Sequence, residues 1–133
     1  MIKPEELRIG NWLKSGSEYF QVANIEGHVL YGGEIKPIEL TEEILIKAGF
    51  EEVMHFTVTR SLHKSIGRDR IISIGCIGTP NEMIWLCERN KISPSHITDL
   101  VCIRNYDYDG KTYIHQLQNL HFSLTGKELT INL

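Results

Sequence analysis

The first forty residues alternate short hydrophobic segments with turn signals, a pattern typical of short antiparallel strands. Apolar and aromatic positions predict strands over 10–14, 19–25, 28–31 and 35–40. The segments between them, Ser15-Gly-Ser17, Glu26-Gly27 and Gly32-Gly33, predict tight turns. We therefore expect an SH3-like meander at the N-terminus, with a small and strongly twisted sheet.

Residues 40–50 carry the signals of a short helix. Thr41 suits the N-cap, and two glutamates follow in the first turn, where the helix dipole favours negative charge. Gly49 suits the left-handed position after the last turn, which lets Phe50 fold back on the helix.

The middle of the chain predicts further strands. Segments 70–77 and 82–87 are apolar on both faces, so we expect two central strands joined by a turn at 78–81. The alternation over 53–58 predicts a strand with one apolar face. Residues 97–103 fit either a strand or a short helix.

Residues 111–125 have helical periodicity, and Gly126 suits the position that ends the helix. The apolar stripe of this helix consists of Tyr113, Leu117, Leu120 and Leu124, flanked by Ile114 and His121. Residues 128–133 then alternate cleanly, which predicts a final strand at a sheet edge.

These elements predict an α+β fold, in which a short helix and a longer C-terminal helix pack on antiparallel sheet. The chain has 133 residues, which suits one domain over 1–133. Within it, 1–40 is a candidate β-meander subdomain and 41–133 the α+β remainder.

Composition excludes several classes of protein. Hydrophobic residues make up 41% of the chain, too many for a disordered polar chain. The net charge of −3 argues against nucleic-acid binding by bulk charge. The cysteines form no C-x-x-C pair, and no segment predicts a secretory signal or a membrane span. We expect a cytoplasmic protein without membrane contact, in which Cys76 and Cys102 lie in apolar runs and are buried free thiols.

No motif predicts catalysis, a metal site or a cofactor. The six histidines lie outside any nucleophile signature, and His115 and His121 are spaced six apart, unlike a zinc pair. Residues 105–110 resemble a calcium loop, but the closing position falls on Gln116 instead of a bidentate glutamate. Phosphate-binding glycine motifs are absent. We expect no enzyme activity, no metal and no cofactor; an enzyme using His55, His63 or His96 as a base is a weaker hypothesis.

One basic segment, residues 59–70, stands out in an acidic chain. Its candidate binding residues are Arg60, His63, Lys64, Arg68 and Arg70, with Asp69 the one acidic residue among them. The segment fits either a solvated loop between strands or a loop that contacts phosphate or an acidic protein surface.

The back of the C-terminal helix carries a second candidate surface. His115, Asn119 and Phe122 follow helical spacing on the face opposite the leucine stripe. This face fits either an interface, including a homodimer contact, or a surface that the final strand or a loop covers.

The chain ends carry a resemblance. The segments Glu6-Leu-Arg-Ile-Gly-Asn11, 38–50 and 114–129 resemble an uncharacterised family of small proteins encoded by phages and prophage-like elements of gut bacteria. Its members open with a near "ELRIGN" and close with a near "VHQLQNLYFALTGKEL"; here His121 replaces the usual Tyr and Ser123 the usual Ala. The resemblance implies a mobile-element gene expressed in a bacterial cytoplasm. It implies no activity and no functional residues.

The sequence thus leads to one main hypothesis and an alternative. In the first, a non-enzymatic phage-type module binds a host or phage macromolecule, protein or nucleic acid, through the basic central loop. In the alternative, the protein is an oligomer that sequesters a small molecule or nucleotide.

Overall fold

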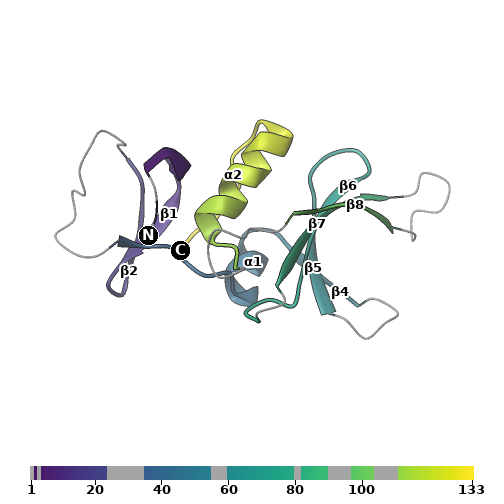
Figure 1. Cartoon of the computed structure of the whole chain (residues 1–133), viewed down its shortest axis with the longest axis horizontal. Helices are drawn as coiled ribbons and strands as arrows, with labels where there is room; N and C mark the ends of the chain where they lie inside the picture. Colours follow the sequence, from purple (N-terminus) through teal and green to yellow (C-terminus); the bar gives the residue numbers. More distant parts are fainter. Residues whose placement is uncertain are drawn as a thin grey trace. The chain divides into compact units, whose positions relative to one another are not determined.

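The computed structural model describes residue 2 and residues 4–23, 35–54, 60–79, 82–89, 97–103 and 111–133. Its elements are η1 (Pro4–Glu6), β1 (Trp12–Ser15), β2 (Glu18–Gln21), β3 (Ile35–Lys36), α1 (Glu42–Lys47), β4 (Glu51–Met54), β5 (Arg60–Ser65), β6 (Arg70–Gly75), β7 (Met83–Arg89), β8 (Ile97–Ile103) and α2 (Ile114–Thr125). Figure 1 shows antiparallel strands together with the two α-helices, so the predicted α+β class is confirmed.

The chain forms two compact units. Unit 1 comprises Met1–Glu39, Tyr113–Leu129 and Leu133, and unit 2 comprises Leu40–Thr112 and Thr130–Asn132. The boundary after residue 39 lies at the end of the predicted meander. The C-terminal helix, however, belongs to the N-terminal unit and not to the remainder of the chain.

Unit 1 contains a three-stranded antiparallel sheet in the order β2-β1-β3. Trp12 pairs with Gln21, and Gly16 adopts a positive φ of 61° in the turn between the two strands. The predicted first hairpin is therefore confirmed, with strands that begin and end within a few residues of the expected bounds. The predicted strand at 28–31 and the turns at 26–27 and 32–33 lie outside the described residues.

Helix α2 packs against β1 within unit 1. The Gln116 side chain accepts the backbone N–H of Tyr113 at 2.9 Å, and the N–H of Ile114 donates to the carbonyl of Ile38 at 2.9 Å. These bonds begin the helix later than position 111, where periodicity alone placed it. It ends as predicted at Gly126, whose φ is 72°.

The buried face of α2 differs from the predicted leucine stripe. Leu117 is buried, but Tyr113, Leu120 and Leu124 are only partly buried. The other buried helix positions are Ile114, His115, Gln118 and His121. The helix is rotated relative to the prediction, and unit 1 supplies hydrogen-bond partners for the buried Gln118 amide and the His121 imidazole.

The predicted final strand is wrong, because residues 128–133 form no β-ladder in the described structure. The alternation itself is real, since Leu129 and Ile131 are buried while Thr130 and Asn132 are exposed. Alternate burial requires only an extended chain over an apolar surface, whereas a strand also requires a hydrogen-bonded neighbour.

Unit 2 contains a five-stranded antiparallel sheet in the order β4-β5-β6-β7-β8. The predicted central hairpin is the pair β6–β7, and the ambiguous segment 97–103 is the strand β8. Leu62, Ile74 and Ile84 form one buried cross-strand row through the middle of the sheet. Of the predicted strand over 53–58, residues 53–54 belong to β4 and residues 55–58 lie outside the described residues.

Helix α1 forms as its sequence predicts. The Thr41 hydroxyl accepts the backbone N–H of Ile44 at 3.2 Å, the N-cap bond that its position favours. At the other end Gly49 has a φ of 91°, and the N–H of Phe50 returns to the carbonyl of Leu45 at 3.0 Å.

Candidate functional site

The basic segment is not the loop that its charge pattern predicted. Residues Arg60–Ser65 form β5, which lies between β4 and β6 in the sheet of unit 2. Ser61, Leu62 and His63 are buried there. The segment Arg60–Ser65 has one apolar residue, Leu62, so it lacks the alternation of apolar and polar positions that marks a strand in a sequence.

Lys64, one of the predicted binding residues, packs over the end of α1. Its Nζ lies 2.7 Å from the point where a Cβ on Gly49 would stand. A cation at the C-terminal end of a helix interacts favourably with the helix dipole. Lys64 is half-buried, so we assign it a structural role.

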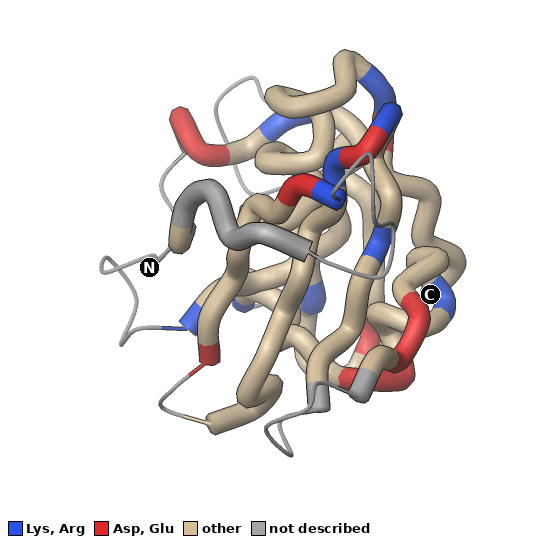
Figure 2. The backbone as a smooth tube through the Cα atoms, turned by 90° about the vertical axis from the view of Figure 1, so that its right-hand side faces the viewer, with Lys and Arg blue, Asp and Glu red and all other residues tan. Residues whose placement is uncertain are grey.

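Arg68 and Arg70 remain exposed, at the turn between β5 and β6. The N–H of Ile66 bonds to the carbonyl of Arg70 at 3.0 Å and closes this turn, in which Asp69 has a φ of 59°. Figure 2 shows Lys and Arg in separate short stretches of backbone, several of them next to Asp or Glu along the chain. Of the predicted basic site, the structure brings together only these two arginines; the side chain of Arg60 lies outside what it describes.

The predicted interface on the back of α2 is largely internal. His115 is 0% exposed, and Asn119 is half-buried in a polar network within unit 1. Phe122 is 41% exposed, and the guanidinium carbon of Arg8 lies over its ring, 4.1 Å from the ring centroid. The homodimer prediction relied on exposed His115 and Phe122, and the burial of His115 removes half of that reason.

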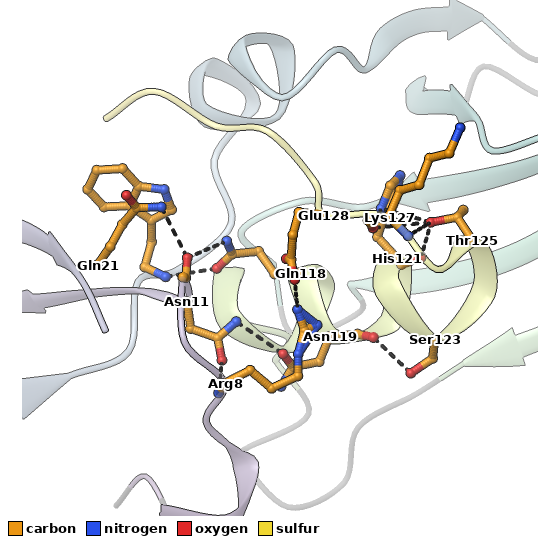
Figure 3. A network of polar contacts seen from close by, with 12 residues as sticks. Arg8, Asn11, Gln21, Gln118, Asn119, His121, Ser123, Thr125, Lys127 and Glu128 are labelled. Atoms are coloured by element: carbon orange, nitrogen blue, oxygen red, sulfur yellow. Dashed lines mark hydrogen bonds and ion pairs between the residues drawn. The ribbon is translucent and has the colours of Figure 1, made fainter. Parts of the chain in front are cut away.

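The network joins the N-terminal segment to α2 (Figure 3). Asn11 accepts the backbone N–H of Arg8 at 2.7 Å and donates to the side chain of Asn119 at 3.0 Å. Gln118 accepts the N–H of Trp12 at 2.8 Å and donates to the carbonyl of Gly10 at 3.1 Å. The side-chain amides of Asn11 and Gln118 are both buried, and each has a hydrogen-bond partner for its oxygen and for its nitrogen. We therefore assign this network a structural role.

His115 is the exception in this region. Neither ring nitrogen has a hydrogen-bond partner in the described structure, and Nε2 lies 3.6 Å from a carboxylate oxygen of Glu6. Burial lowers the pKa of His115, and the Glu6 carboxylate opposes part of that shift. The imidazole is therefore held neutral at neutral pH.

A pocket of about 450 Å³ lies in unit 2, a volume within the usual range of small-molecule sites. Three segments line it: the start of α1, the start of β5 and the turn after β6. Its lining residues are Leu40, Thr41, Glu42, Ser61, Leu62, Cys76, Ile77 and Gly78.

Ser61 in the pocket wall is hydrogen-bonded to His63. The distance between Ser61 Oγ and His63 Nε2 is 3.1 Å, and the two side chains are 5% and 7% exposed. Residues two apart on a strand share a face, so β5 itself holds the pair together. His63 is not among the residues that line the pocket.

The turn after β6 is braced by a buried carboxylate. Glu82 accepts the N–H of Gly78 at 2.9 Å and the N–H of Thr112 at 3.1 Å. At the start of this turn Cys76 has a positive φ of 54°, and its carbonyl accepts from the Thr79 hydroxyl at 2.7 Å. The turn is therefore fixed at two places, which gives the pocket a defined wall. The predicted burial of Cys76 and Cys102 is wrong, since both are exposed.

The chain matches no protein-family model, no curated protein and no solved structure. In the part that the structure describes, no group of three or more His, Cys, Asp or Glu side chains could hold a metal ion. No helix in that same part is long and apolar enough to span a membrane.

Sequence reasoning missed the pocket, the Ser61–His63 bond and the bracing by Glu82. The spacing of Ser61 and His63 was available in the sequence once 60–65 is taken as a strand. The pocket was not, because its walls come from segments that only the tertiary fold brings together.

Proposed function

We propose that the protein binds a small ligand in the pocket of unit 2. The observation that carries this proposal is the pocket of about 450 Å³ with a buried, hydrogen-bonded Ser61–His63 pair at its wall. A mainly apolar concave site with a few fixed polar groups is the usual form of a small-molecule site.

The lining indicates the chemistry of the ligand. Leu40, Leu62 and Ile77 offer apolar surface, while the hydroxyls of Thr41 and Ser61 offer hydrogen bonds. Among the residues that the structure describes, the lining includes an acidic residue, Glu42, and neither Lys nor Arg. A phosphate group requires cations or a cradle of backbone amides, so the pocket favours an uncharged ligand over a nucleotide.

Thermal unfolding with a panel of neutral fragments and of nucleotides tests the proposal. A ligand at 100 times its Kd stabilises the folded state by about 2.7 kcal/mol, which is readily measured. Ile77→Trp fills the pocket, and Ile46→Trp is the matched control because Ile46 is exposed on α1 outside it. We expect neutral fragments to raise the Tm of wild type and I46W but not of I77W. Stabilisation by nucleotides alone, or equal stabilisation of I77W, would contradict the proposal.

A second candidate function is contact with an acidic protein surface through Arg68 and Arg70. Both side chains are exposed on one closed turn, which supports a small contact point. Two cations neutralise about two phosphates, far fewer than the six to ten of a typical DNA-binding protein, so nucleic acid is the less favoured partner. Affinity capture from bacterial lysate should lose specific partners with R68A/R70A and keep them with K36A/K127A, where both replaced lysines are exposed. Identical captures from all three proteins would exclude this function.

We also propose a phage or prophage origin, a bacterial cytoplasmic location and an SH3-like closure of the N-terminal strands. The resemblance of the two chain ends supports the origin and location, and the β1–β2 hairpin supports the closure. The genes beside this one test the origin: integrase, capsid or tail genes are expected, and a purely chromosomal neighbourhood would contradict it. Backbone NMR of residues 24–34 tests the closure.

A further inference from the structure

We propose that the pocket hydrolyses small uncharged carboxylic esters, with Ser61 as the nucleophile and His63 as the general base. The inference rests on the proposed function, since a substrate must first occupy the pocket. It goes beyond binding because a hydroxyl paired with an imidazole is a reactive group as well as a hydrogen-bonding one.

The geometry of the pair meets the first requirement of this chemistry. The distance of 3.1 Å between Ser61 Oγ and His63 Nε2 lies within the range for a nucleophile and its base. Ser61 contributes to the pocket wall and His63 does not, so of the two residues Ser61 is the one that a bound substrate would contact. Burial of both side chains restricts competing contacts with bulk water.

The sheet also places a carboxylate beside the base. In the antiparallel register of β4 and β5, Glu51 stands directly opposite His63. Directly opposite residues have Cβ atoms about 4.5–5.5 Å apart and share a face of the sheet. Glu51 is itself exposed, so the register and not an observed contact supports its role: from this position its carboxylate would orient the imidazole and stabilise its protonated form.

The reaction balances with the groups present and water. Ser61 Oγ forms a bond to the carbonyl carbon while its proton passes to His63 Nε2. The bond from that carbon to the alcohol oxygen then breaks, and the His63 proton leaves with the alcohol. Water attacks the acyl-serine, gives one proton to His63 and releases the carboxylic acid, and the His63 proton returns to Ser61.

The pocket wall limits the substrate class. The apolar side chains Leu40, Leu62 and Ile77 suit a short acyl chain, and the described part of the lining, which holds neither Lys nor Arg, suits an uncharged ester. The Thr41 hydroxyl accepts from the N–H of Ile44, so its own hydrogen can be donated to an oxygen of the substrate.

Two measurements on the full chain test the inference. The first is hydrolysis of p-nitrophenyl butyrate, with heat-denatured protein as the background. The second is reaction with a fluorophosphonate, followed by mass spectrometry to locate the adduct. We expect turnover above background and an adduct on Ser61. An adduct on Cys76 or on a surface residue, or no adduct at all, would overturn the inference without any need for a variant.

Variants then separate reactivity from packing. Ser61→Ala should abolish adduct formation and reduce turnover to background, and His63→Gln should slow turnover by at least about 100-fold. Ser73→Ala is the matched control. Ser73 is 6% exposed, about as buried as Ser61, and it stands opposite His63 on β6. It is not among the residues that line the pocket. S73A should keep both signals, and thermal unfolding verifies that each variant folds. Equal loss in S61A and S73A would also overturn the inference.

The outcome distinguishes this inference from the proposed function. If neutral fragments stabilise the protein in an I77W-sensitive way but Ser61 never forms an adduct, the pocket binds ligand and does not hydrolyse it. If neither occurs, both proposals fail.

Discussion

Asn11 Nδ2 donates to Asn119 Oδ1 across 3.0 Å, and this bond joins two segments that lie 108 positions apart in the chain. Each residue belongs to one of the two end motifs on which the family resemblance depends. Asn119 also donates to the carbonyl of Glu6 at 2.6 Å, and the Arg8 guanidinium pairs with Glu128. The end motifs are therefore two halves of one internal interface, and their long polar pattern is explained by stability of unit 1.

This interface predicts a measurable coupling between the two asparagines. Asn11→Ala and Asn119→Ala each leave buried polar groups without partners, so each should lower the free energy of unfolding by about 1–3 kcal/mol. The double variant should lose less than the sum, with a coupling energy of about 0.5–3 kcal/mol. Urea unfolding measures all four corners of the cycle. Asn132→Ala, at an exposed position, is the control and should stay within about 0.5 kcal/mol of wild type; strict additivity would contradict the interface.

His115 predicts a loss of stability in mild acid. Burial lowers its pKa from the ordinary 6.5, so below that value the unfolded chain binds a proton that the folded protein does not. The contribution is fully present above the unfolded pKa and is lost as pH falls below it toward the folded pKa. The urea midpoint should therefore decrease between about pH 7.5 and about pH 5.5, a range in which ordinary carboxylates stay ionised.

Glu6 supplies the control for the acid effect. Its carboxylate, 3.6 Å from His115 Nε2, raises the pKa of His115 in part, so Glu6→Gln should lower that pKa further. E6Q should then lose more stability in acid than wild type does, and His115→Gln should lose less. The hypothesis would be wrong if E6Q reduced the acid sensitivity.

Glu82 is expected to control the order of the pocket wall. In wild type each carboxylate oxygen of Glu82 accepts one N–H group, from Gly78 or from Thr112. In Glu82→Gln one oxygen is replaced by an NH₂ group, so one of these two N–H groups faces a donor and loses its partner. We expect a loss of about 1–3 kcal/mol in the free energy of unfolding, measured by urea unfolding. Ligand-induced Tm shifts should shrink as well, because Gly78 lines the pocket. Glu18→Gln, at an exposed position on β2, should change neither quantity.

Gly49 predicts a backbone effect that can be separated from a contact effect. With φ at 91°, Gly49→Ala places a side chain in the left-handed region, at a cost of about 1–2 kcal/mol. The new Cβ would also stand 2.7 Å from Lys64 Nζ. In the K64A background the contact is absent and the backbone strain stays. Gly49→Ala should therefore lower the free energy of unfolding of K64A as well, but by less than it does in wild type. If Gly49→Ala had no effect in K64A, backbone strain would contribute nothing at this position.

Local elements were predictable where neighbouring residues alone provide the stabilising contacts. Thr41 and Gly49 specify the ends of α1 through bonds within ten residues, and the structure has both. The hairpins β1–β2 and β6–β7 likewise depend on short turns. Where a partner is distant, prediction was wrong: the final strand has no ladder, and β5 was taken for a loop because it is rich in charge and has one apolar residue.

The candidate site was predictable only in part, and for the same reason. Charge pointed to 60–70, but the sheet buries Ser61 and His63, places Lys64 over α1 and leaves Arg68 and Arg70 outside. The histidine named as a binding residue is instead bonded to a serine in a pocket wall.

The sequence by itself determined the α+β class, the capped helix α1 and the left-handed end of α2, because these follow from propensities and hydrogen bonds between near neighbours. Only the tertiary structure decided which face of α2 is buried, that the chain ends bind each other, and that three separate segments line one pocket. Those features depend on which distant groups satisfy each buried polar atom. The order of residues along the chain does not record that pairing, because many alternative partners have the same chemistry.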